Sequence, residues 1–412
     1  MKSKYLLTLM VLFLLCISVF ATRARVESMG KSDAFFMDDF SIFRNPSNIN
    51  IYPNFLIGEL GTYDEPYNPD FDSTAWMKGM TPQNKDPLHP YYGGIFSYSL
   101  NKDKELGSRY PQITIGAIVN KQNELVDTLI DKLNLNKAIV LGNDTTTDIG
   151  SKFNPVGLHT DMFIGFTSKK GQMFGLHYFG AFQNDRYEGK EDSAYKTTVM
   201  KFDLGTNLPV GRVADLEVNA GVGFLGFNSP NSKSSGFDNS VNFDLRLFST
   251  LEAINGEIVP ICGIKAFEIE RLEYKYSKIY AGVGINVTLD RGFFWLGMQG
   301  VNEKFNDGDD NVFSVPFSFG IERNIIWDWF VWRVGGMKKV MLVRNGSHKY
   351  WSSNPEGDGT ANDQVSVGWG LNIEEKLKVD GVVAEDIFYT WGNIISGNSH
   401  HVLTKITATY SF

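Results

Sequence analysis

The chain has 412 residues, with 39 Lys and Arg against 47 Asp and Glu, and a formal net charge of −8. This acidic balance, without a cluster of basic residues, argues against a nucleic-acid partner, because phosphate binding requires clustered Lys and Arg. Beyond the amino-terminal stretch, no apolar run is long enough for a transmembrane helix. With 14% aromatic residues and 41 glycines, the remaining route across a membrane is a closed β-barrel.

Residues 1–21 have the features of a secretory signal peptide. Two lysines precede an apolar core from Leu6 to Leu15, and the segment ends on the small residue Ala21. This pattern fits cleavage after Ala21. Cleavage would remove Cys16 and leave Cys262 alone, so we expect no intramolecular disulfide.

Long alternating segments fill most of the remaining chain. In residues 278–290 (KIYAGVGINVTLD), Val283 and Ile285 fall on an apolar face, whereas Gly284 and Asn286 fall on the opposite one. This period of two is that of a β-strand. A soluble β-sandwich also alternates, but its strands are usually nearer five or six residues, whereas these reach about ten.

Charged residues recur within these segments on the face opposite the apolar one, as a wet lumen permits. They are Asp203, Asp244, Arg246 and Lys405. Alternation indicates about sixteen candidate strands between Phe55 and Phe412. The segment from Leu377 to Tyr389 is the weakest, because Gly381 and the pair Glu385-Asp386 interrupt its pattern.

The carboxyl terminus reads HVLTKITATYSF, and it alternates up to its last residue. A final strand with Tyr410 two residues before a terminal Phe412 resembles the assembly signal of bacterial outer-membrane barrels. The last strand must be captured at its edge before the barrel closes, and a terminal aromatic marks the membrane interface. We therefore expect Tyr410 and Phe412 to act in assembly.

The stretch from Arg25 to Tyr52 contains three spaced motifs. They are Met29-Gly30, Asp38-Asp39 and Asn45-Pro46-Ser47. Their order resembles the start of the FadL-like outer-membrane barrels, a family that includes the PorV-type secretion barrels. Two departures mark a divergent member: Ser47 replaces the usual Ala, and Lys31 follows Gly30 in place of a second Gly. An ordinary loop before the first strand is the alternative.

The resemblance implies an all-β fold, a transmembrane antiparallel β-barrel of about 14 strands (range 12–16). Residues 22–54 would form a hatch or plug folded into the lumen, and residues 55–412 the barrel. The implied function is passage of hydrophobic small molecules across the outer membrane of a Gram-negative bacterium. The alternative is a PorV-like structural or secretion-associated barrel that binds or presents secreted proteins. Outer-membrane lipid and the barrel assembly machinery are the expected partners.

Connections of two kinds separate the segments. Tight ones, such as Lys169-Lys170-Gly171, fit periplasmic turns, whereas the long stretches 65–90, 121–154 and 345–363 fit extracellular loops. Within the second stretch, residues 124–135 have the apolar spacing of a helix. Its apolar face consists of Leu125, Leu129, Ile130 and Leu133. In FadL-like barrels such a helix forms an apolar entry site; a helix that merely caps the barrel mouth is equally consistent.

Candidate sites for chemistry are weak. The acidic turn at Asp307, Asp309 and Asp310 and the stretch GNDTTTD (residues 142–148) lack the spacing of a calcium loop. His400 and His401 are adjacent, so on a strand they point to opposite faces. The sequence contains no hydrolase elbow, zinc-protease motif or phosphate loop. We therefore expect no metal, no cofactor and no enzymatic activity.

Overall fold

The computed structural model describes most of the chain from Arg23 onward. The described residues are 23–30, 32–61, 91–100, 111–121, 123, 125–126, 159–187, 190–211, 213–228, 237–269, 274–305, 310–324, 327–345, 364–373, 376–383 and 403–412. The predicted signal peptide (residues 1–21) lies outside them. So do most of the three predicted extracellular loops, the stretch 142–148, and the residues Asp307, Asp309, His400 and His401.

Sixteen antiparallel strands among the described residues close into one barrel in which each strand pairs with its neighbours in sequence, and β1 pairs with β16. The strands are β1 (Phe55–Gly61), β2 (Tyr91–Ser99), β3 (Gln112–Val119), β4 (Thr160–Thr167), β5 (Met173–Tyr187), β6 (Lys190–Val210), β7 (Ala214–Asn228), β8 (Phe237–Leu251), β9 (Gly256–Ile269), β10 (Tyr274–Leu289), β11 (Gly292–Phe305), β12 (Asp310–Asn324), β13 (Phe330–Asn345), β14 (Gln364–Ile373), β15 (Leu377–Val383) and β16 (Leu403–Ser411).

The predicted all-β antiparallel barrel is thus confirmed, with sixteen strands in place of about fourteen, at the upper limit of the predicted range of 12–16. The doubtful segment that begins at Leu377 is a strand, β15, which pairs with β14 on one side and β16 on the other. Its alternation is broken because Gly381 lies under the neighbouring Trp369: a Cβ on Gly381 would meet the Trp369 ring at 2.5 Å. The large residue of one strand thus covers the position that the next strand leaves empty.

The predicted alternation of faces is confirmed along the strands. On β10, Ile285 is 39% exposed and Asn286, the next residue, only 5%. The same contrast separates Leu296 from Trp295 on β11 and Leu204 from Asp203 on β6. An apolar exterior of this kind is the surface that membrane hydrocarbon requires.

We expect Ile285→Lys to lower the free energy of unfolding by about 2–4 kcal/mol, the cost of a Lys near the bilayer midplane. Leu289→Lys is the matched control on the same face of the strand, because Leu289 ends β10 beside the turn to β11, where the cost falls to about 0–1 kcal/mol. Urea titration of the protein in lipid vesicles measures both. Equal losses in the two variants would show that the exterior face has been assigned wrongly.

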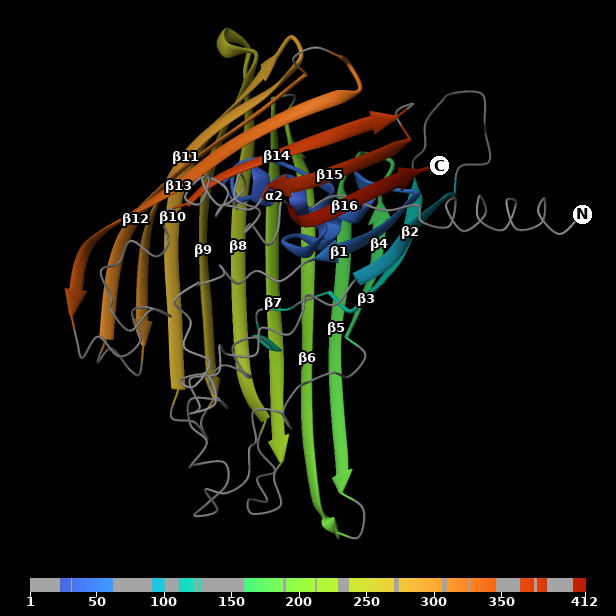
Figure 1. Cartoon of the computed structure of the whole chain (residues 1–412), viewed down its shortest axis with the longest axis vertical. Coiled ribbons are helices and arrows are strands. Elements are labelled where there is room, and N and C mark those ends of the chain that lie inside the picture. Colours follow the sequence, from blue (N-terminus) through green and yellow to red (C-terminus); the bar gives the residue numbers. More distant parts are fainter. Residues whose placement is uncertain are drawn as a thin grey trace, which may run out of the picture.

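Short turns gather at one end of the barrel. Residues 168–172 join β4 to β5, and residues 290–291 join β10 to β11, as the sequence predicted. The described strands differ in length around the wall: β5–β13 have 14–21 residues, whereas β1–β4 and β14–β16 have 7–10. Figure 1 shows this asymmetry, with the long strands extending well past the short ones.

Among the described residues, three short helices precede β1. They are α2 (Arg23–Ser28), η1 (Asp39–Phe43) and η2 (Pro46–Asn50), and a further 3-10 turn, η4 (Glu252–Ile254), joins β8 to β9. α2 contacts β13–β16, whereas η2 contacts β3–β6. Figure 1 draws the three helices that precede β1 in blue, beside the short strands. Residues 23–52 therefore touch strands that lie far apart around the wall.

None of the helices among the described residues is long and apolar enough to span a membrane.

Candidate functional site

The Met29-Gly30 turn, the first predicted motif, fits against strand glycines. Met29 is fully buried, and a Cβ on Gly320 of β12 would lie 2.8 Å from the Met29 Cβ. A Cβ on Gly335 of β13 would overlap the backbone of the turn. Gly30 has φ +92°, a conformation that favours glycine, and its N–H donates to Ser366 Oγ at 3.0 Å. The motif is therefore a close backbone-to-backbone contact with the wall.

An aromatic cluster follows the turn. Phe35 and Phe36 are buried, and their rings lie 6.1 Å and 5.4 Å from that of Trp295 on β11. The Phe36 ring also meets Phe293 edge-on at 5.7 Å. These contacts account for the apolar composition that the sequence shows at this point, because the two rings are removed from water by the wall.

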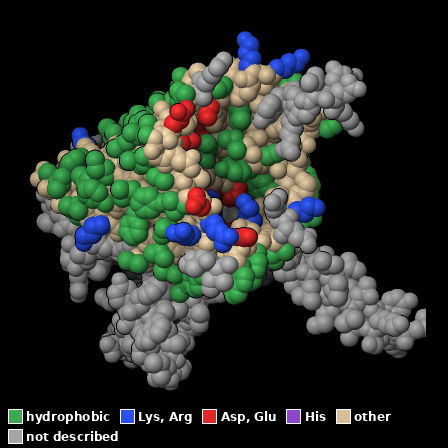
Figure 2. All heavy atoms as spheres, turned by 90° about the horizontal axis from the view of Figure 1, so that it is seen from above, with side chains coloured by type: hydrophobic (Ala, Val, Ile, Leu, Met, Phe, Trp, Pro, Cys, Tyr) green, Lys and Arg blue, Asp and Glu red, His purple; other side chains and the backbone are tan. Residues whose placement is uncertain are grey.

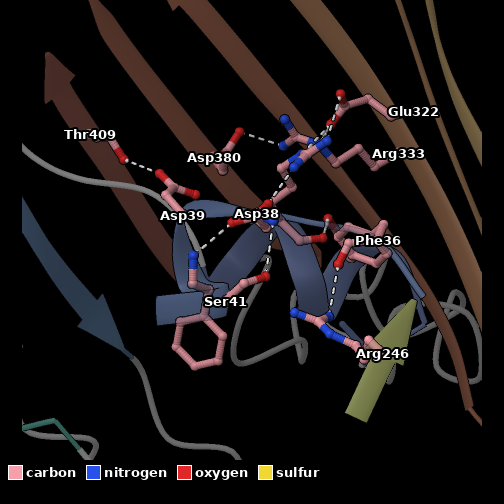
Figure 3. Close-up of polar contacts among 12 residues, drawn as sticks. Phe36, Asp38, Asp39, Ser41, Arg246, Glu322, Arg333, Asp380 and Thr409 are labelled. Atoms are coloured by element: carbon pink, nitrogen blue, oxygen red, sulfur yellow. Dashed lines mark hydrogen bonds and ion pairs between the residues drawn. The ribbon is translucent and has the colours of Figure 1, made fainter. Parts of the chain in front are cut away.

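The Arg25 network is the set of ion pairs made by Arg25, Asp38, Glu322, Arg333 and Asp380. Arg25 pairs with Asp38 of its own segment, and its Nε donates to Glu322 of β12 at 2.8 Å. Arg333 of β13 donates to the same Glu322 at 2.5 Å and pairs with Asp380 of β15. Figure 3 shows this chain of contacts. Negative and positive side chains thus alternate from residues 23–52 to the strands β12, β13 and β15.

The two motif aspartates have separate roles. Asp38 caps η1: it accepts from Phe40 N–H at 3.0 Å, and Ser41 Oγ accepts from the N–H of Asp38. Burial alone would raise the pKa of Asp38, but the Arg25 charge and the hydrogen bonds with Asp39, Phe40 N–H and Arg25 together hold that pKa below its usual value. The neighbouring Asp39 accepts from Thr409 Oγ1 of β16 at 3.2 Å.

Arg246, one of the inward charges noted in the sequence, contacts the backbone of residues 33–36. Its Nε donates to Glu217 of β7 at 2.8 Å, while its Nη1 donates to the carbonyl oxygens of Asp33 at 2.9 Å and Phe36 at 3.4 Å. Arg246 is 1% exposed, and Figure 3 shows it reaching Phe36.

Asn45 and Pro46 begin the helix η2. Asn45 caps η2, with its Oδ1 accepting from Ser47 N–H at 3.1 Å, and Pro46 occupies the first turn. The Asn45 Nδ2 donates to the Thr206 carbonyl of β6 at 3.0 Å. A Cβ on Gly205 would overlap Asn45. The motif therefore starts a helix that fits against β6.

A buried histidine, which sequence reasoning did not single out, lies opposite η1. His177 of β5 places Nε2 2.8 Å from Asp161 of β4 and Nδ1 2.9 Å from Asp203 of β6. The ring stacks on Phe163 at 4.5 Å, and Phe43 of η1 meets it edge-on at 6.4 Å. Asp203 had been noted as an inward charge, but only the register places it beside His177.

The predicted loop helix is described only in part. Leu125 is buried in helical conformation, and a Cβ on Gly223 of β7 would lie 3.0 Å from its Cδ1. Leu129, Ile130 and Leu133 lie outside the described residues. The choice between an entry site and a cap stays a prediction.

The carboxyl-terminal aromatics lie together beside the ends of β1 and β2. Phe412 is 55% exposed, and its ring lies 5.5 Å from Phe96 of β2 and 6.4 Å from Tyr410. The Phe412 N–H also donates to the Asn54 carbonyl at 3.1 Å. The last residue thus contacts both sides of the seam between β16 and β1.

We expect deletion of Phe412 to reduce the folded fraction in the membrane several-fold, because it removes both ring contacts and the terminal backbone bond at the seam. Heat-modifiable migration on a gel measures the folded fraction. Phe412→Trp is the control, since it keeps an interfacial aromatic. A deletion that folds as well as the intact chain would contradict an assembly role.

Within the part of the chain that the structure describes, no group of three or more His, Cys, Asp or Glu side chains is placed to hold a metal ion. Figure 2 shows both acidic and basic side chains in the middle of the end face, with hydrophobic side chains around them.

No protein-family model and no curated protein matches the chain. Among the solved structures that match, three cover 87% of it. CdiB from Escherichia coli does so over 63% of its own length, at 9% identity and a TM-score of 0.39. CdiB from Acinetobacter baumannii is covered over 59%, at 9% identity and 0.42. BamA from Haemophilus ducreyi lacking POTRA domains 1-3 is covered over 70%, at 8% identity and 0.41. The chain thus spans less than two thirds of either CdiB protein. With these TM-scores it is assigned to neither the CdiB nor the BamA proteins.

The predicted membership of the FadL-like barrels is wrong. The three solved structures named above are CdiB and BamA barrels rather than FadL-type ones. The sixteen strands lie at the upper limit of the predicted range of 12–16. The predicted passage of hydrophobic small molecules is corrected with it. It rested on the resemblance alone. At the described positions Gly284, Gly297 and Gly335, the barrel faces the Phe35 ring and the backbone of Met29-Gly30.

Proposed function

We propose that the chain is a closed β-barrel of the Gram-negative outer membrane, with residues 23–52 filling its lumen, and that it binds or presents a protein partner. This is a structural or secretion-associated role. The single observation that carries the proposal is the reach of residues 23–52: α2 contacts β13–β16, the Phe35 ring meets β10 and β11, and η2 contacts β3–β6. A segment held at so many points supports a filled lumen better than a channel.

The contacts also support a permanent part of the fold rather than a loosely placed loop. Met29, Phe35, Ile42 and Ile49 are each fully buried, and burial of side chains of this size contributes about 1.5–3 kcal/mol each. Charged and backbone contacts fix the same segment at Arg25 and Asn45. An occupied lumen leaves the two barrel ends as the surfaces that a partner can use.

The proposal includes no catalytic role. His177 is the strongest candidate for acid–base chemistry among the described side chains, yet both of its ring nitrogens are engaged by carboxylates. A general base needs a free lone pair directed at a substrate proton. The Asp161–His177–Asp203 arrangement therefore favours a structural role.

The experiment compares the proteins at the cell surface and in the medium between cells with and without the gene. We expect specific exported proteins to be lost from the surface without the gene and restored by the intact chain, while uptake of labelled small solutes stays unchanged. A set of exported proteins that is unchanged, together with altered solute uptake, would overturn the proposed role.

A further inference from the structure

The cluster around His177 has a geometry that requires charge. A neutral imidazole carries one N–H, so it can donate from only one of its two nitrogens. Both nitrogens of His177 lie within 3 Å of carboxylate oxygens, at 2.8 Å from Asp161 and 2.9 Å from Asp203. Ionised carboxylates only accept hydrogen bonds. The arrangement is therefore complete only when His177 is the doubly protonated cation.

The surroundings make this charge matter. The side chains of His177, Asp161 and Asp203 are 4%, 2% and 1% exposed. Lys201 of β6 pairs with Asp203 at 2.8 Å, and Asn242 of β8 donates to the same carboxylate at 3.2 Å. With His177 protonated, the two carboxylates are balanced by two cations. Loss of the proton would leave a ring lone pair facing a buried carboxylate, which is costly away from water.

The charged cluster supports residues 23–52 directly. From β4, Phe163 stacks on the His177 ring, and from η1, Phe43 meets both rings edge-on, at 6.4 Å from His177 and 5.5 Å from Phe163. The Lys121 Nζ lies 4.0 Å from the centroid of the Phe43 ring. A shift of the imidazole away from either aspartate therefore moves the surface on which Phe43 rests.

The Arg25 network on the other side of the segment does not share this sensitivity. Arginine stays protonated at any pH the protein meets. Asp38, whose pKa is held below its usual value, contributes its stabilisation above its unfolded-state pKa and loses it only as the pH falls through the lower, folded-state value. The contacts of α2 thus persist at alkaline pH, where a histidine gives up its proton.

We propose that His177 is a pH-sensitive clasp, which holds η1 and η2 against β4–β6 while protonated and releases them when the pH rises. The α2 side stays fixed through Arg25. This inference rests on the proposed filling of the lumen by residues 23–52. The sign follows from the geometry: the stabilisation is present at low pH and is lost as the proton leaves. Residues of η1 and η2 are then released from the strands, while α2 remains bound.

The experiment measures access of water to each side of the segment in the full-length protein in lipid vesicles. In a background with Cys16→Ser and Cys262→Ser, Asn48→Cys reports on η2 and Ala24→Cys reports on α2, because both positions are fully buried. The rate of labelling by a water-soluble methanethiosulfonate is divided by the rate for the same protein in denaturant, which corrects for thiol ionisation. Hydrogen exchange of residues 43–50 and 23–28 in the unsubstituted protein is the second measurement.

We expect the corrected rate at position 48 to rise by up to about tenfold per pH unit, the limit for loss of one proton, at pH values above the ordinary histidine pKa of about 6.5. The rate at position 24 should stay low.

Asp161→Asn should move the rise to lower pH, because one carboxylate no longer favours the cation. His177→Gln should give fast labelling at position 48 without pH dependence. His159→Gln, whose ring packs on Phe179, should behave as the parent.

Three outcomes are decisive. Labelling at position 48 that stays slow at every pH, with unchanged hydrogen exchange, overturns the clasp and leaves the filled lumen standing. A pH-dependent rise that survives His177→Gln also overturns the clasp. Fast labelling at both positions at neutral pH overturns the filled lumen, and the clasp with it.

Discussion

Replacing Arg246 with Ala should lower the free energy of unfolding by about 3–5 kcal/mol, because it leaves a buried charge without its partner. Arg246 is 1% exposed and pairs with Glu217, which is 2% exposed. The same change removes the hydrogen bonds to the carbonyl oxygens of Asp33 and Phe36. Denaturant titration in detergent micelles, followed by tryptophan fluorescence, measures the loss.

The double variant Arg246→Met with Glu217→Leu separates the two contributions. It removes both charges, and replacing a buried pair by apolar side chains is often close to neutral for the wall. The segment still loses its two carbonyl partners, at about 1.5–3 kcal/mol for hydrogen bonds to a charged group. We therefore expect a recovered barrel with faster hydrogen exchange in residues 33–36. If the double variant recovered both the stability of the barrel and the slow hydrogen exchange of residues 33–36, Arg246 would not hold residues 23–52 in place.

The second large effect concerns the space that two glycines of the barrel leave for the Phe35 ring. Gly284 and Gly297 face each other in the register of β10 and β11, and a Cβ on either would overlap the Phe35 ring. Gly297→Val should therefore expel the ring, at a cost of about 1–3 kcal/mol or more for overpacking. Removing the ring by Phe35→Ala should itself cost about 3–5 kcal/mol.

Combining the two changes tests whether they act at one place. The Gly297→Val, Phe35→Ala double variant should be more stable than the sum of the single losses, with a coupling of about 0.5–3 kcal/mol. Gly300→Val is the matched control on β11, since a Cβ there meets nothing closer than Phe313 at 3.7 Å. Additive losses from Gly297→Val and Phe35→Ala would place Phe35 elsewhere.

The barrel could be predicted because its signal is local. Val283 and Ile285 alternate with Gly284 and Asn286 along one stretch of chain, and the exposed fractions follow that pattern. Alternation alone indicated about sixteen strands, and the number fourteen came from the resemblance. The strand that looked weakest is the one in which Gly381 breaks the pattern, because the residue that covers it, Trp369, belongs to another strand. A single sequence gives no sign of that pairing.

The candidate site could be predicted only in part, for a related reason. The motif residues Gly30, Asp38 and Asn45 lie at a turn and at two helix caps, since local capping and turn chemistry depend on neighbours in sequence. Their partners did not follow. Arg25 meets Glu322 across 297 positions, and which inward carboxylate it reaches depends on the register and closure of the whole wall. His177 could have been noted as an inward polar residue, but its two aspartates become neighbours only through strand pairing.

The filled lumen is the central claim, and conductance in planar bilayers tests it most directly. The intact protein should stay closed or conduct weakly, whereas a variant lacking residues 23–52 should insert and conduct ions steadily, because the segment that contacts β3–β6, β10–β11 and β13–β16 is gone. Circular dichroism and heat-modifiable migration verify that the truncated barrel is folded. Equal conductance of the folded truncated and intact proteins would contradict the account, because residues 23–52 would then not close the barrel.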